Sequence, residues 1–417
     1  MLQSKLFYKT KKSAPKEAEA ISHKLLYRGD FIDQLGSGIY SFLPLGWLVH
    51  QNIANIIRDE MNILDGQEIF LPAMHPKNVW EQSGRWDKMR PPLFKLKDSH
   101  KKDFAMGPTH EEVMAKIAKG RIISYKNLPL ALFQIQSKFR NEMRYTGGLL
   151  RTREFVMKDL YSFHADQSDF EKYYEKVAKA YLRIFDRCGI KALRVKASGE
   201  GFTKEFTDEF QAITPVGEDT IVFCQKCDFA RNKEISKLNE GDKCPQCGSL
   251  LKQEKGIEIG NIFPLGTKYS ESFDLKFKNK SGEEKFVIMA SYGIGIGRLM
   301  SAIVETHNDA KGILWPKEVA PFLIHIIPVE IGDKKVEAMA KKIYQNGQEK
   351  TKRVIYDDRR NVSAGEKFAE SDLLGIPFKV IVSKKTLEKD SVEIEERSGK
   401  KSRLIKIKEV LDFNFYV

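Results

Sequence analysis

Basic and aromatic side chains gather around one short stretch in the first half of the chain. Two strand-like runs flank a turn that contains Gly147 and Gly148: residues 130–139 and 154–163. This pattern predicts a long β-hairpin. At its mouth, the planar guanidinium of Arg140 can hold a phosphate oxygen, and Arg151 or Arg153 can meet further phosphates. Phe155 can stack on a base. The stretch therefore predicts a nucleotide site, with a solvated basic hairpin as the alternative.

Four of the five cysteines form a second chemical pattern. Two CxxC pairs, Cys224 with Cys227 and Cys244 with Cys247, are separated by sixteen residues. This is the spacing of a four-cysteine zinc ribbon, whose thiolates converge tetrahedrally on the metal. Four thiolates leave no open coordination position, so the pattern predicts a structural Zn²⁺ site. Disulfides fit less well in a chain without an apolar secretion signal, and Cys188 fits a small buried residue.

Two further groups are weaker signals by themselves. Thr109 follows a Gly-Pro turn and can cap a helix with Glu112 three residues later, which leaves Glu111 unexplained. Alternating glycines between Tyr292 and Arg298 let a ligand approach the backbone closely. Their spacing is neither that of a P-loop nor that of a dinucleotide fingerprint.

Taken together, these motifs resemble those of class II aminoacyl-tRNA synthetases. The hairpin has the motif 2 order of an aromatic residue, Arg140, any residue, Glu142, a loop, and then Arg and Phe. Arg298 resembles the arginine of motif 3. The matches at residues 107–112 and 292–298 resemble the bacterial-type prolyl-tRNA synthetase in particular, and the resemblance covers almost the whole chain.

The resemblance implies a reaction and the residues that perform it. Proline would be activated by ATP with Mg²⁺, and the adenylate would then be attacked by the terminal ribose hydroxyl of tRNA(Pro). Arg140 and Arg298 would be the catalytic arginines, Arg140 between the proline carboxylate and the α-phosphate and Arg298 on the γ-phosphate. The implied proline site is Thr109, Glu111, Arg140, His164 and Ser291. The implied ATP site is Arg140, Glu142, Arg151, Phe155, Gln211, Glu218 and Arg298.

The chain departs from the family pattern in places. Asp208 stands where the family has a histidine, so that pocket role is not carried over, and Ser291 stands where many members have cysteine. Only about forty residues lie between Cys224 and Phe263, where most bacterial members carry a long editing domain. The resemblance therefore implies a chain without that domain, whose mischarged alanyl-tRNA is tolerated or cleared by a separate hydrolase.

The expected fold is an α+β catalytic domain with a class II antiparallel sheet flanked by helices, a small zinc-ribbon-like insertion and a C-terminal α/β anticodon-binding domain. The expected boundaries are 1–219 for the catalytic domain with motifs 1 and 2, 220–255 for the insertion, 256–314 for the catalytic domain with motif 3, and 315–417 for the anticodon-binding domain. A helix at 47–64 and a strand at 69–72 resemble motif 1, which implies a homodimer.

The C-terminal part shows the clearest alternation of strands and helices. Buried-strand runs at 322–329, 353–356 and 377–382 alternate with helical patterns at 333–345 and 363–374, which predicts a small α/β domain. The run 357–369 resembles the anticodon-binding domain shared by the prolyl, threonyl, histidyl and glycyl enzymes. The implied anticodon-binding residues are Asp358, Arg359 and Lys367.

Composition agrees with an RNA partner. The 70 Lys and Arg against 57 Asp and Glu give a net charge of +13, which favours a polyanion. The absence of an apolar run of about 18 residues and of a signal core indicates no membrane association and a cytoplasmic location. Three alternatives remain: a synthetase for another amino acid such as threonine, a synthetase-like paralogue that binds tRNA without catalysis, and a plain zinc-ribbon nucleic-acid binder.

Overall fold

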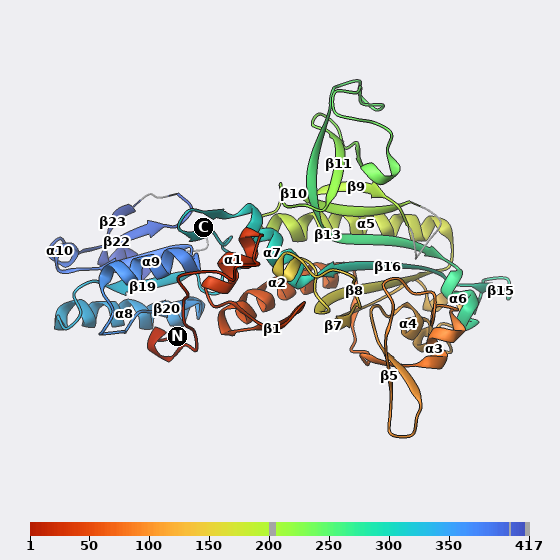
Figure 1. Ribbon diagram of the computed structural model, residues 1–417, viewed down its shortest axis with the longest axis horizontal. Coiled ribbons are helices and arrows are strands. Elements are labelled where there is room, and N and C mark those ends of the chain that lie inside the picture. The colour runs from red at the N-terminus through yellow and green to blue at the C-terminus, as the bar shows by residue number, and fades with distance from the viewer. Residues whose placement is uncertain (200–205, 400–401, 413–417) are drawn as a thin grey trace. The chain divides into compact units, whose positions relative to one another are not determined.

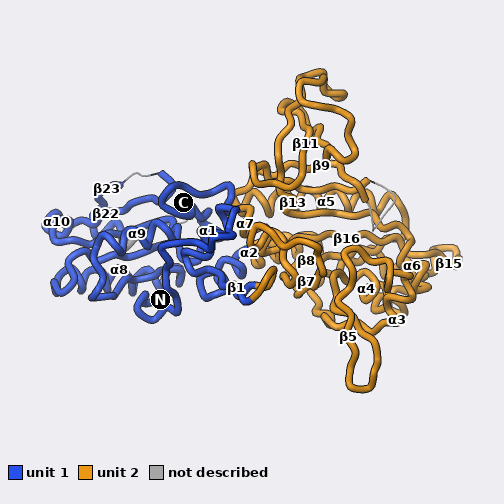
Figure 2. The backbone as a smooth tube through the Cα atoms, in the orientation of Figure 1, with its two compact units in different colours: residues 1–35, 40–53, 303–417 blue, residues 36–39, 54–302 orange. Residues whose placement is uncertain are grey.

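The protein is described here by a computed structural model that covers residues 1–199, 206–399 and 402–412. The chain forms two compact units (Figures 1 and 2). Unit 1 contains residues 1–35, 40–53 and 303–417, and unit 2 contains residues 36–39 and 54–302. The N-terminal segment, which we expected within the catalytic domain, thus groups with the C-terminal part of the chain.

Unit 2 is built on a nine-stranded sheet. Its order is β10 (Thr207–Ile213), β9 (Leu193–Ala197), β12 (Ala230–Asn232), β11 (Asp219–Cys224), β13 (Leu251–Gly266), β16 (Ile288–Gly295), β8 (Glu154–His164), β7 (Leu130–Phe139) and β3 (Gln67–Glu68). All neighbours are antiparallel except β12 with β9 and β3 with β7. The expected antiparallel sheet is confirmed.

The expected hairpin lies at the centre of this sheet. β7 and β8 pair from Leu130 opposite Phe163 to Phe139 opposite Glu154, and β16 lies on the other side of β8. Gly293 of β16 is opposite Asp159 of β8. The two sequence motifs, more than a hundred residues apart, are therefore neighbouring strands.

Helix α5 (Gln167–Arg187) covers the sheet beside these strands. Its aromatic residues Tyr181 and Phe185 pack on Phe210 of β10, with ring centroids 5.1 and 5.6 Å away. A Cβ on Gly260 of β13 would lie only 3.0 Å from Phe185 and 3.2 Å from Tyr181. Glycine at this position lets the helix approach the strand closely.

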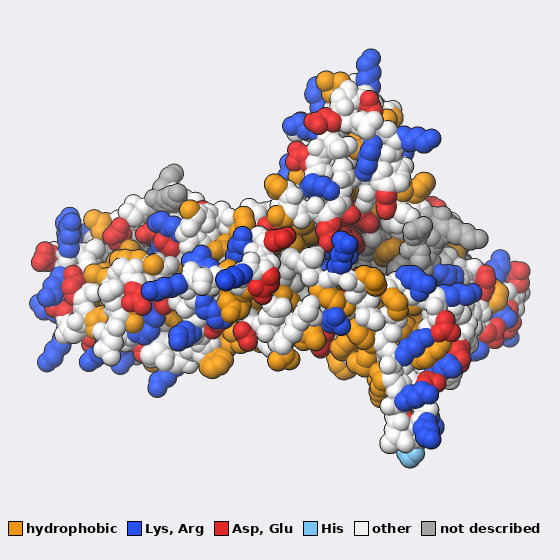
Figure 3. All heavy atoms as spheres, in the orientation of Figure 1, with side chains coloured by type: hydrophobic (Ala, Val, Ile, Leu, Met, Phe, Trp, Pro, Cys, Tyr) orange, Lys and Arg blue, Asp and Glu red, His pale blue; other side chains and the backbone are white. Residues whose placement is uncertain are grey.

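Besides β16, strand β13 pairs with two different strands along its length. β13 pairs with β11 through residues 251–256 and with β10 through residues 256–262. The first half of β13, with β11 and β12, carries the cysteine-rich projection of residues 224–251, and Figure 3 shows Lys and Arg side chains over its visible face. The second half of the same strand continues into the centre of the sheet. One strand thus joins the projection to the motif strands.

Smaller elements complete unit 2. They are β4 (Met74–Pro76), α3 (Lys77–Gln82), β5 (Phe94–Lys97), β6 (Asp103–Met106), α4 (Glu111–Ala118), η2 (Tyr125–Asn127), η3 (Gly148–Leu150), η4 (Lys233–Ile235), α6 (Lys268–Phe273), β14 (Lys276–Lys278) and β15 (Glu284–Phe286). One expectation was wrong here. The strand expected at 69–72 is instead β3, because only Gln67 and Glu68 meet β7.

Unit 1 contains the expected α/β domain. Its five-stranded sheet has the order β20 (Val354–Tyr356), β19 (Ile324–Pro328), β21 (Phe378–Val382), β22 (Ser391–Glu396) and β23 (Ser402–Lys406). The first three strands are parallel and the last two antiparallel. Its main helices are α8 (Lys334–Thr351) and α9 (Ala364–Leu374), and α8 buries Val336, Ala340 and Ile343 against the sheet.

The remaining elements are η1 (Gln3–Lys5), α1 (Ile21–Arg28), β1 (Ile32–Gly36), β2 (Ile39–Phe42), α2 (Pro44–Ile63), α7 (Ile296–Thr306), β17 (Asn308–Asp309), β18 (Gly312–Ile313), α10 (Lys384–Leu387) and α11 (Ile407–Asp412). The helix expected at 47–64 is α2. Within the described ranges, no helix has the length and apolar character needed to span a membrane.

Candidate active site

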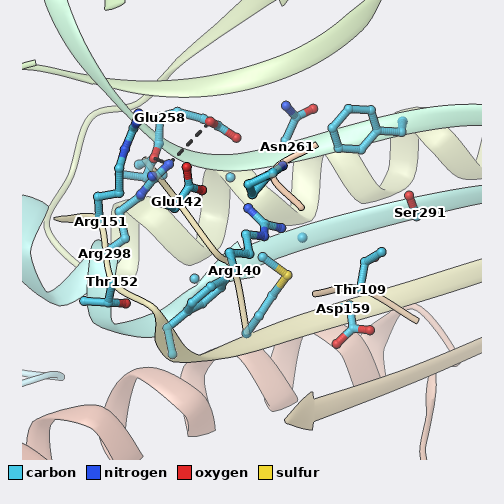
Figure 4. Close-up of a pocket in the computed structure, with 18 of the residues that line it drawn as sticks. Thr109, Arg140, Glu142, Arg151, Thr152, Asp159, Glu258, Asn261, Ser291 and Arg298 are labelled. Carbon is cyan, nitrogen blue, oxygen red and sulfur yellow. Dashed lines mark hydrogen bonds and ion pairs between the residues drawn. The ribbon is translucent and has the colours of Figure 1, made fainter. Parts of the chain in front are cut away.

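A cavity of about 240 Å³ opens in unit 2 where β7, β8, β13 and β16 meet the start of α7 (Figure 4). Eight of the residues implied by the sequence line it: Thr109, Glu111, Arg140, Glu142, Arg151, Phe155, Ser291 and Arg298. They come from segments spread over almost two hundred residues of chain. The sheet order described above is what brings them together.

Two of the arginines are held by carboxylates. Arg298, in the first turn of α7, donates through Nε to the Leu150 carbonyl (2.9 Å) and forms an ion pair with Glu258 (3.4 Å). Arg151 forms an ion pair with Glu218, with 2.5 Å between nitrogen and oxygen. Each guanidinium is therefore fixed in place and keeps further N–H donors for a ligand.

Arg140 is held differently. Its guanidinium lies over the Phe155 ring, 5.2 Å from the centroid, and within the described part of the chain no side-chain hydrogen bond or ion pair engages it. Burial and then repulsion from Arg298 lower the pKa of Arg140. A cation in this position, with its donors uncommitted, is suited to an anionic ligand, which would supply the missing partner.

The Thr109 and Glu111 side chains lie in the same cavity. The Thr109 hydroxyl is 2.7 Å from both carboxylate oxygens of Glu111, and both residues are buried. The expectation that Thr109 caps helix α4 was wrong: the N-cap residue is His110, and no side-chain hydrogen bond caps the helix. The threonine hydroxyl bonds to the Glu111 carboxylate instead. Glu111, which had no role in the expected cap, is thus part of the cavity wall.

A buried polar network holds this loop against the hairpin. Lys138 of β7 forms an ion pair with Asp159 of β8 (2.8 Å), and its Nζ lies 2.7 Å from Nδ1 of His110. Burial, followed by the charge of Lys138, lowers the pKa of His110, so the ring is neutral. Nδ1 then accepts from Lys138, and Nε2 donates to the Pro72 carbonyl (3.0 Å). The residues on either side of His110 are thereby positioned by the hairpin.

Three implied residues do not line the cavity. Glu218 reaches it only through its ion pair with Arg151. His164 bonds to Asp169 (2.6 Å) and to the Ser162 hydroxyl (2.8 Å), which in turn bonds to the cavity residue Tyr292 (2.8 Å). The third is Gln211.

Gln211 belongs to a buried carboxylate cluster beside the cavity. Its Nε2 donates to Glu209 (3.0 Å) and to Asp219 (2.8 Å), and its Oε1 has no partner among the described residues. Asn232 also donates to Glu209 (3.4 Å). Burial, and then the charges of Glu258 and Asp219, raise the pKa of Glu209 to about 8. Glu209 is therefore mainly protonated at neutral pH.

Asp208, the departure from the family pattern, faces away from this cluster. It is buried and forms ion pairs with Lys196 (2.9 Å) and Arg194 (3.1 Å) of β9. Alternate residues of a strand point to opposite faces, so Asp208 lies opposite Glu209 and Gln211. A carboxylate at this position is accounted for by its two cationic partners.

Several cavity residues were missed by the sequence analysis, notably Arg90, Glu258, Asn261 and Tyr292. Glu258 and Asn261 lie on β13, among buried isoleucines. Polar residues inside an otherwise apolar strand were the available signal. Oδ1 of Asn261 is buried without a hydrogen-bond partner in the described ranges, so it can accept from a ligand.

The four cysteines of the projection converge. Their sulfur atoms all lie within 4.8 Å of one another, with 3.5 Å between Cys224 and Cys247 and between Cys227 and Cys244. Sulfurs bound tetrahedrally to one zinc ion at about 2.3 Å are about 3.8 Å apart. The donor set and its spacing therefore fit a structural Zn²⁺ ion.

The implied anticodon residues lie together in unit 1, but in different environments. Lys367 is fully buried and forms an ion pair with Asp357 (3.3 Å). Arg359 pairs with Asp357 (2.7 Å) and with Glu370 (2.7 Å). Asp358 is only half-buried. Lys367 therefore supports the corner formed by residues 357–359 from within, whereas Asp358 and Arg359 reach the surface of this corner.

Comparison with known proteins defines the class. Residues 94–307 match the tRNA synthetase class II core domain (G, H, P, S and T), and residues 324–413 match an anticodon binding domain. The fold is also that of prolyl-tRNA synthetase structures from Cryptosporidium parvum and Giardia lamblia. Each has a TM-score of 0.78 at 21% identity, over 94% and 93% of this chain and 75% and 74% of those chains. The fold and core are thus those of a class II tRNA synthetase.

Curated relatives specify the family. The chain is 38% identical to a proline–tRNA ligase of Wolbachia over 99% of both chains, and 32% identical to one from Thermoanaerobacter over 99% of this chain and 98% of the relative. It belongs to the proline–tRNA ligase family. The Thermoanaerobacter alignment spans 562 positions against 417 residues here, so that relative carries about 145 residues with no counterpart in this chain. The Wolbachia alignment, at 423 positions, contains no such insertion.

We expect Glu209 to make the stability of the folded protein fall as pH rises. Its folded pKa of about 8 lies above the ordinary value of 4.5. Between these values the folded chain holds a proton that the unfolded chain has released, so stability decreases with rising pH. Glu209→Gln cannot ionise. The free energy of unfolding of Glu209→Gln minus that of the wild type should therefore increase as the pH rises through this range, by no more than about 1.4 kcal/mol per pH unit.

Urea denaturation at several pH values measures this difference. Glu254→Gln, which changes an exposed carboxylate on β13, is the matched control and should follow the wild type. Parallel stability curves for Glu209→Gln and the wild type would contradict the raised pKa.

Proposed function

We propose that this chain activates proline with ATP to give prolyl-adenylate and pyrophosphate, and then transfers proline to tRNA(Pro). One observation carries the proposal: arginines from separate segments of the chain meet a buried Thr-Glu pair in a single cavity, in a chain of the proline–tRNA ligase family. A threonine-specific enzyme is less well supported because Thr109 and Glu111 lie together in the cavity. A non-catalytic paralogue is less well supported because Arg140, Arg151 and Arg298 are all present and all line the cavity.

The chemistry requires positive charge and alignment. A carboxylate must attack the α-phosphate of ATP, and the two anions repel each other. Arg140 bridges them, because its donors are uncommitted and its position at the end of β7 lies between the ends of the cavity. As negative charge builds on the α-phosphate, a guanidinium already fixed nearby stabilises it without reorganisation.

The nucleotide is held by the arginine end of the cavity. Arg151 and Arg298 bind the outer phosphates, where ATP brings Mg²⁺ to neutralise part of their charge. Phe155 stacks on the adenine, and Glu142 accepts hydrogen bonds from the nucleotide. Glu218 and Gln211 act from outside the lining, Glu218 by orienting Arg151 and Gln211 through its unpartnered oxygen.

Proline is held by the opposite end. Its secondary ammonium pairs with Glu111, which is oriented by the Thr109 hydroxyl. Ser291 lies against the ring. His164 acts at a distance, through the hydrogen-bond chain of Ser162 and Tyr292. The tRNA anticodon is recognised in unit 1 by Asp358 and Arg359, which Lys367 supports through Asp357.

A homodimer is supported by exposed apolar residues in the segment that resembles motif 1. Ile63 and Phe70 are 66% and 77% exposed, and Met74, just after this segment, is 48% exposed; large apolar side chains left in water in this way are suited to cover by a partner. Ile63 also lines a groove of about 730 Å³ with apolar Leu130 and Ala131. Light scattering should give twice the chain mass of 47.9 kDa; a single-chain mass would refute the dimer.

Alanine is the expected error of this enzyme. An apolar pocket distinguishes substrates that differ by a methylene group by only about 1 to 3 kcal/mol, and the chain lacks the long insertion of its larger relatives. We therefore expect the purified chain to form alanyl-tRNA(Pro) and to leave it intact, so that the error is either tolerated or cleared by a separate hydrolase. Preformed alanyl-tRNA should decay at the rate of the buffer control. Rapid deacylation by the chain alone would refute this.

The cysteine projection binds one structural Zn²⁺ ion. We expect elemental analysis of the purified chain to find about one zinc per chain, since four thiolates complete a tetrahedral site. Cys227→Ser should lose the metal and weaken the projection. Cys188→Ser, which changes the buried cysteine outside the cluster, should keep it. A metal-free wild type, or equal zinc in both variants, would show that the cluster does not hold the ion.

The decisive experiment is amino-acid-dependent exchange of pyrophosphate into ATP. Exchange should occur with proline, more weakly with alanine, and not with threonine. Arg140→Ala should lower the proline-dependent rate by about 100- to 1000-fold, the cost of removing one preorganised donor from a transition state. Arg153→Ala is the matched control, because that arginine stacks on Tyr145 and donates to Ser37 without lining the cavity.

Two results would change the conclusion. Exchange with threonine but not with proline would identify the threonine enzyme. Silence with every amino acid, from a folded chain that still binds tRNA, would identify the non-catalytic paralogue.

A further inference from the structure

The N-terminal segment of residues 2–10 lies outside both family-matched ranges, yet it is fastened to the anticodon-binding domain within unit 1. Leu2 forms a parallel bridge with Tyr356 of β20. Gln3 is buried, and its Oε1 lies 2.7 Å from Nε2 of the buried His325 on β19. Buried polar pairing of this kind fixes the segment in a single position.

The same segment also contacts the implied anticodon residues Asp358 and Arg359. The backbone N–H and the hydroxyl of Ser4 both donate to Asp358, at 2.9 and 2.6 Å. The Tyr8 hydroxyl donates to Glu370 (3.0 Å), and the Arg359 guanidinium lies 6.0 Å from the centre of the Tyr8 ring. The segment therefore runs directly past the corner formed by Asp358 and Arg359.

From Lys5 to Thr10, exposed and half-buried side chains alternate. Leu6, Tyr8 and Thr10 are half-buried, and Thr10 donates to Glu370 (3.0 Å). Lys5, Phe7 and Lys9 are exposed. Phe7 is 75% exposed, although the residues on either side of it are anchored. The domain thus presents a basic, aromatic, basic row to solvent.

A single exposed phenylalanine is ordinary on a protein surface, but this ring stands between two exposed lysines on an anchored backbone. Unpaired bases of RNA loops are recognised by stacking on aromatic side chains, and nearby lysines neutralise the phosphates. A rigidly presented ring is well suited to this, because little conformational entropy remains to be lost on binding. The position beside Asp358 and Arg359 directs the row toward the loop that those residues would read.

We propose that residues 2–10 form part of the tRNA-binding surface, with Phe7 stacking on an unpaired base of the anticodon loop and Lys5 and Lys9 contacting its phosphates. This rests on the proposed function, since it assumes that unit 1 binds the anticodon arm. Ser4 and Tyr8 are positioning residues that hold the row beside the domain.

The test measures the dissociation constants of the full chain for a tRNA(Pro) transcript and for the isolated anticodon stem-loop, at one fixed salt concentration. Phe7→Ala should raise both by about 5-fold or more, which corresponds to the 1 to 3 kcal/mol of a base-aromatic stack. Phe7→Trp should bind within about twofold of the wild type, because it keeps the aromatic face. Phe7→Leu should behave like Phe7→Ala, since it keeps only apolar bulk.

Matched controls separate this effect from general damage. Leu404→Ala removes another exposed apolar side chain of unit 1, 53% exposed on β23, and should leave binding unchanged. Proline-dependent pyrophosphate exchange needs no tRNA and should be unchanged in every Phe7 variant. Replacing Lys5 and Lys9 with alanine should reduce the slope of log affinity against log salt by about 0.7 for each phosphate that the protein no longer neutralises, whereas Lys385→Ala should not.

The outcomes distinguish this inference from the function on which it rests. If the wild type binds neither RNA, the anticodon assignment itself fails. If the wild type binds but Phe7→Ala binds equally well, or Phe7→Leu matches the wild type, stacking is refuted while the function stands. Tighter binding by Phe7→Ala would show that the segment covers the site instead of completing it.

Discussion

Repulsion between guanidinium groups is the constraint on which the active cavity depends. Arg140, Arg151 and Arg298 line one cavity of about 240 Å³, and the charge of Arg298 lowers the pKa of Arg140. Flexible side chains would move apart. Here the arginines lie on three separate segments, just after β7, just before β8 and at the start of α7, and Glu258 and Glu218 restrain two of them. The free energy of folding thus holds three guanidinium groups in one cavity, where the uncommitted donors of Arg140 remain available to an anionic ligand.

The third arginine shows why this arrangement suits adenylate formation. Arg140 has a ring beside it instead of a carboxylate, so its hydrogen-bond donors stay available. A carboxylate partner would have competed with the substrate for the same donors. The cavity wall is supported by an ion pair between Lys138, which lies behind the lining, and the lining residue Asp159, and Lys138 also fixes His110.

Much of this could be predicted from the chain itself. The β7–β8 hairpin follows from apolar alternation on both sides of a glycine turn, and the cysteine spacing alone indicated four converging thiols. Predictions that depended on a weak or ambiguous local pattern were wrong. The strand expected at 69–72 moved to β3, because pairing with β7 decides where a short strand begins and ends. Thr109 does not cap helix α4, because its hydroxyl bonds to the buried carboxylate of Glu111 two residues away.

The sequence by itself determined which chemical groups were available and in which type of element each would lie, since residue type and spacing set propensity and hydrogen-bonding capacity. Only the tertiary structure decided which of them share a cavity. Strand register turns Asp208 away from the cavity, because alternate residues face opposite sides of a sheet. A register shift at Ile259 of β13 lets both Glu258 and Asn261 line it, although they are three residues apart. The docking of residues 2–10 beside Asp358 is likewise tertiary. It joins segments about 350 residues apart, through pairings that no local pattern contains.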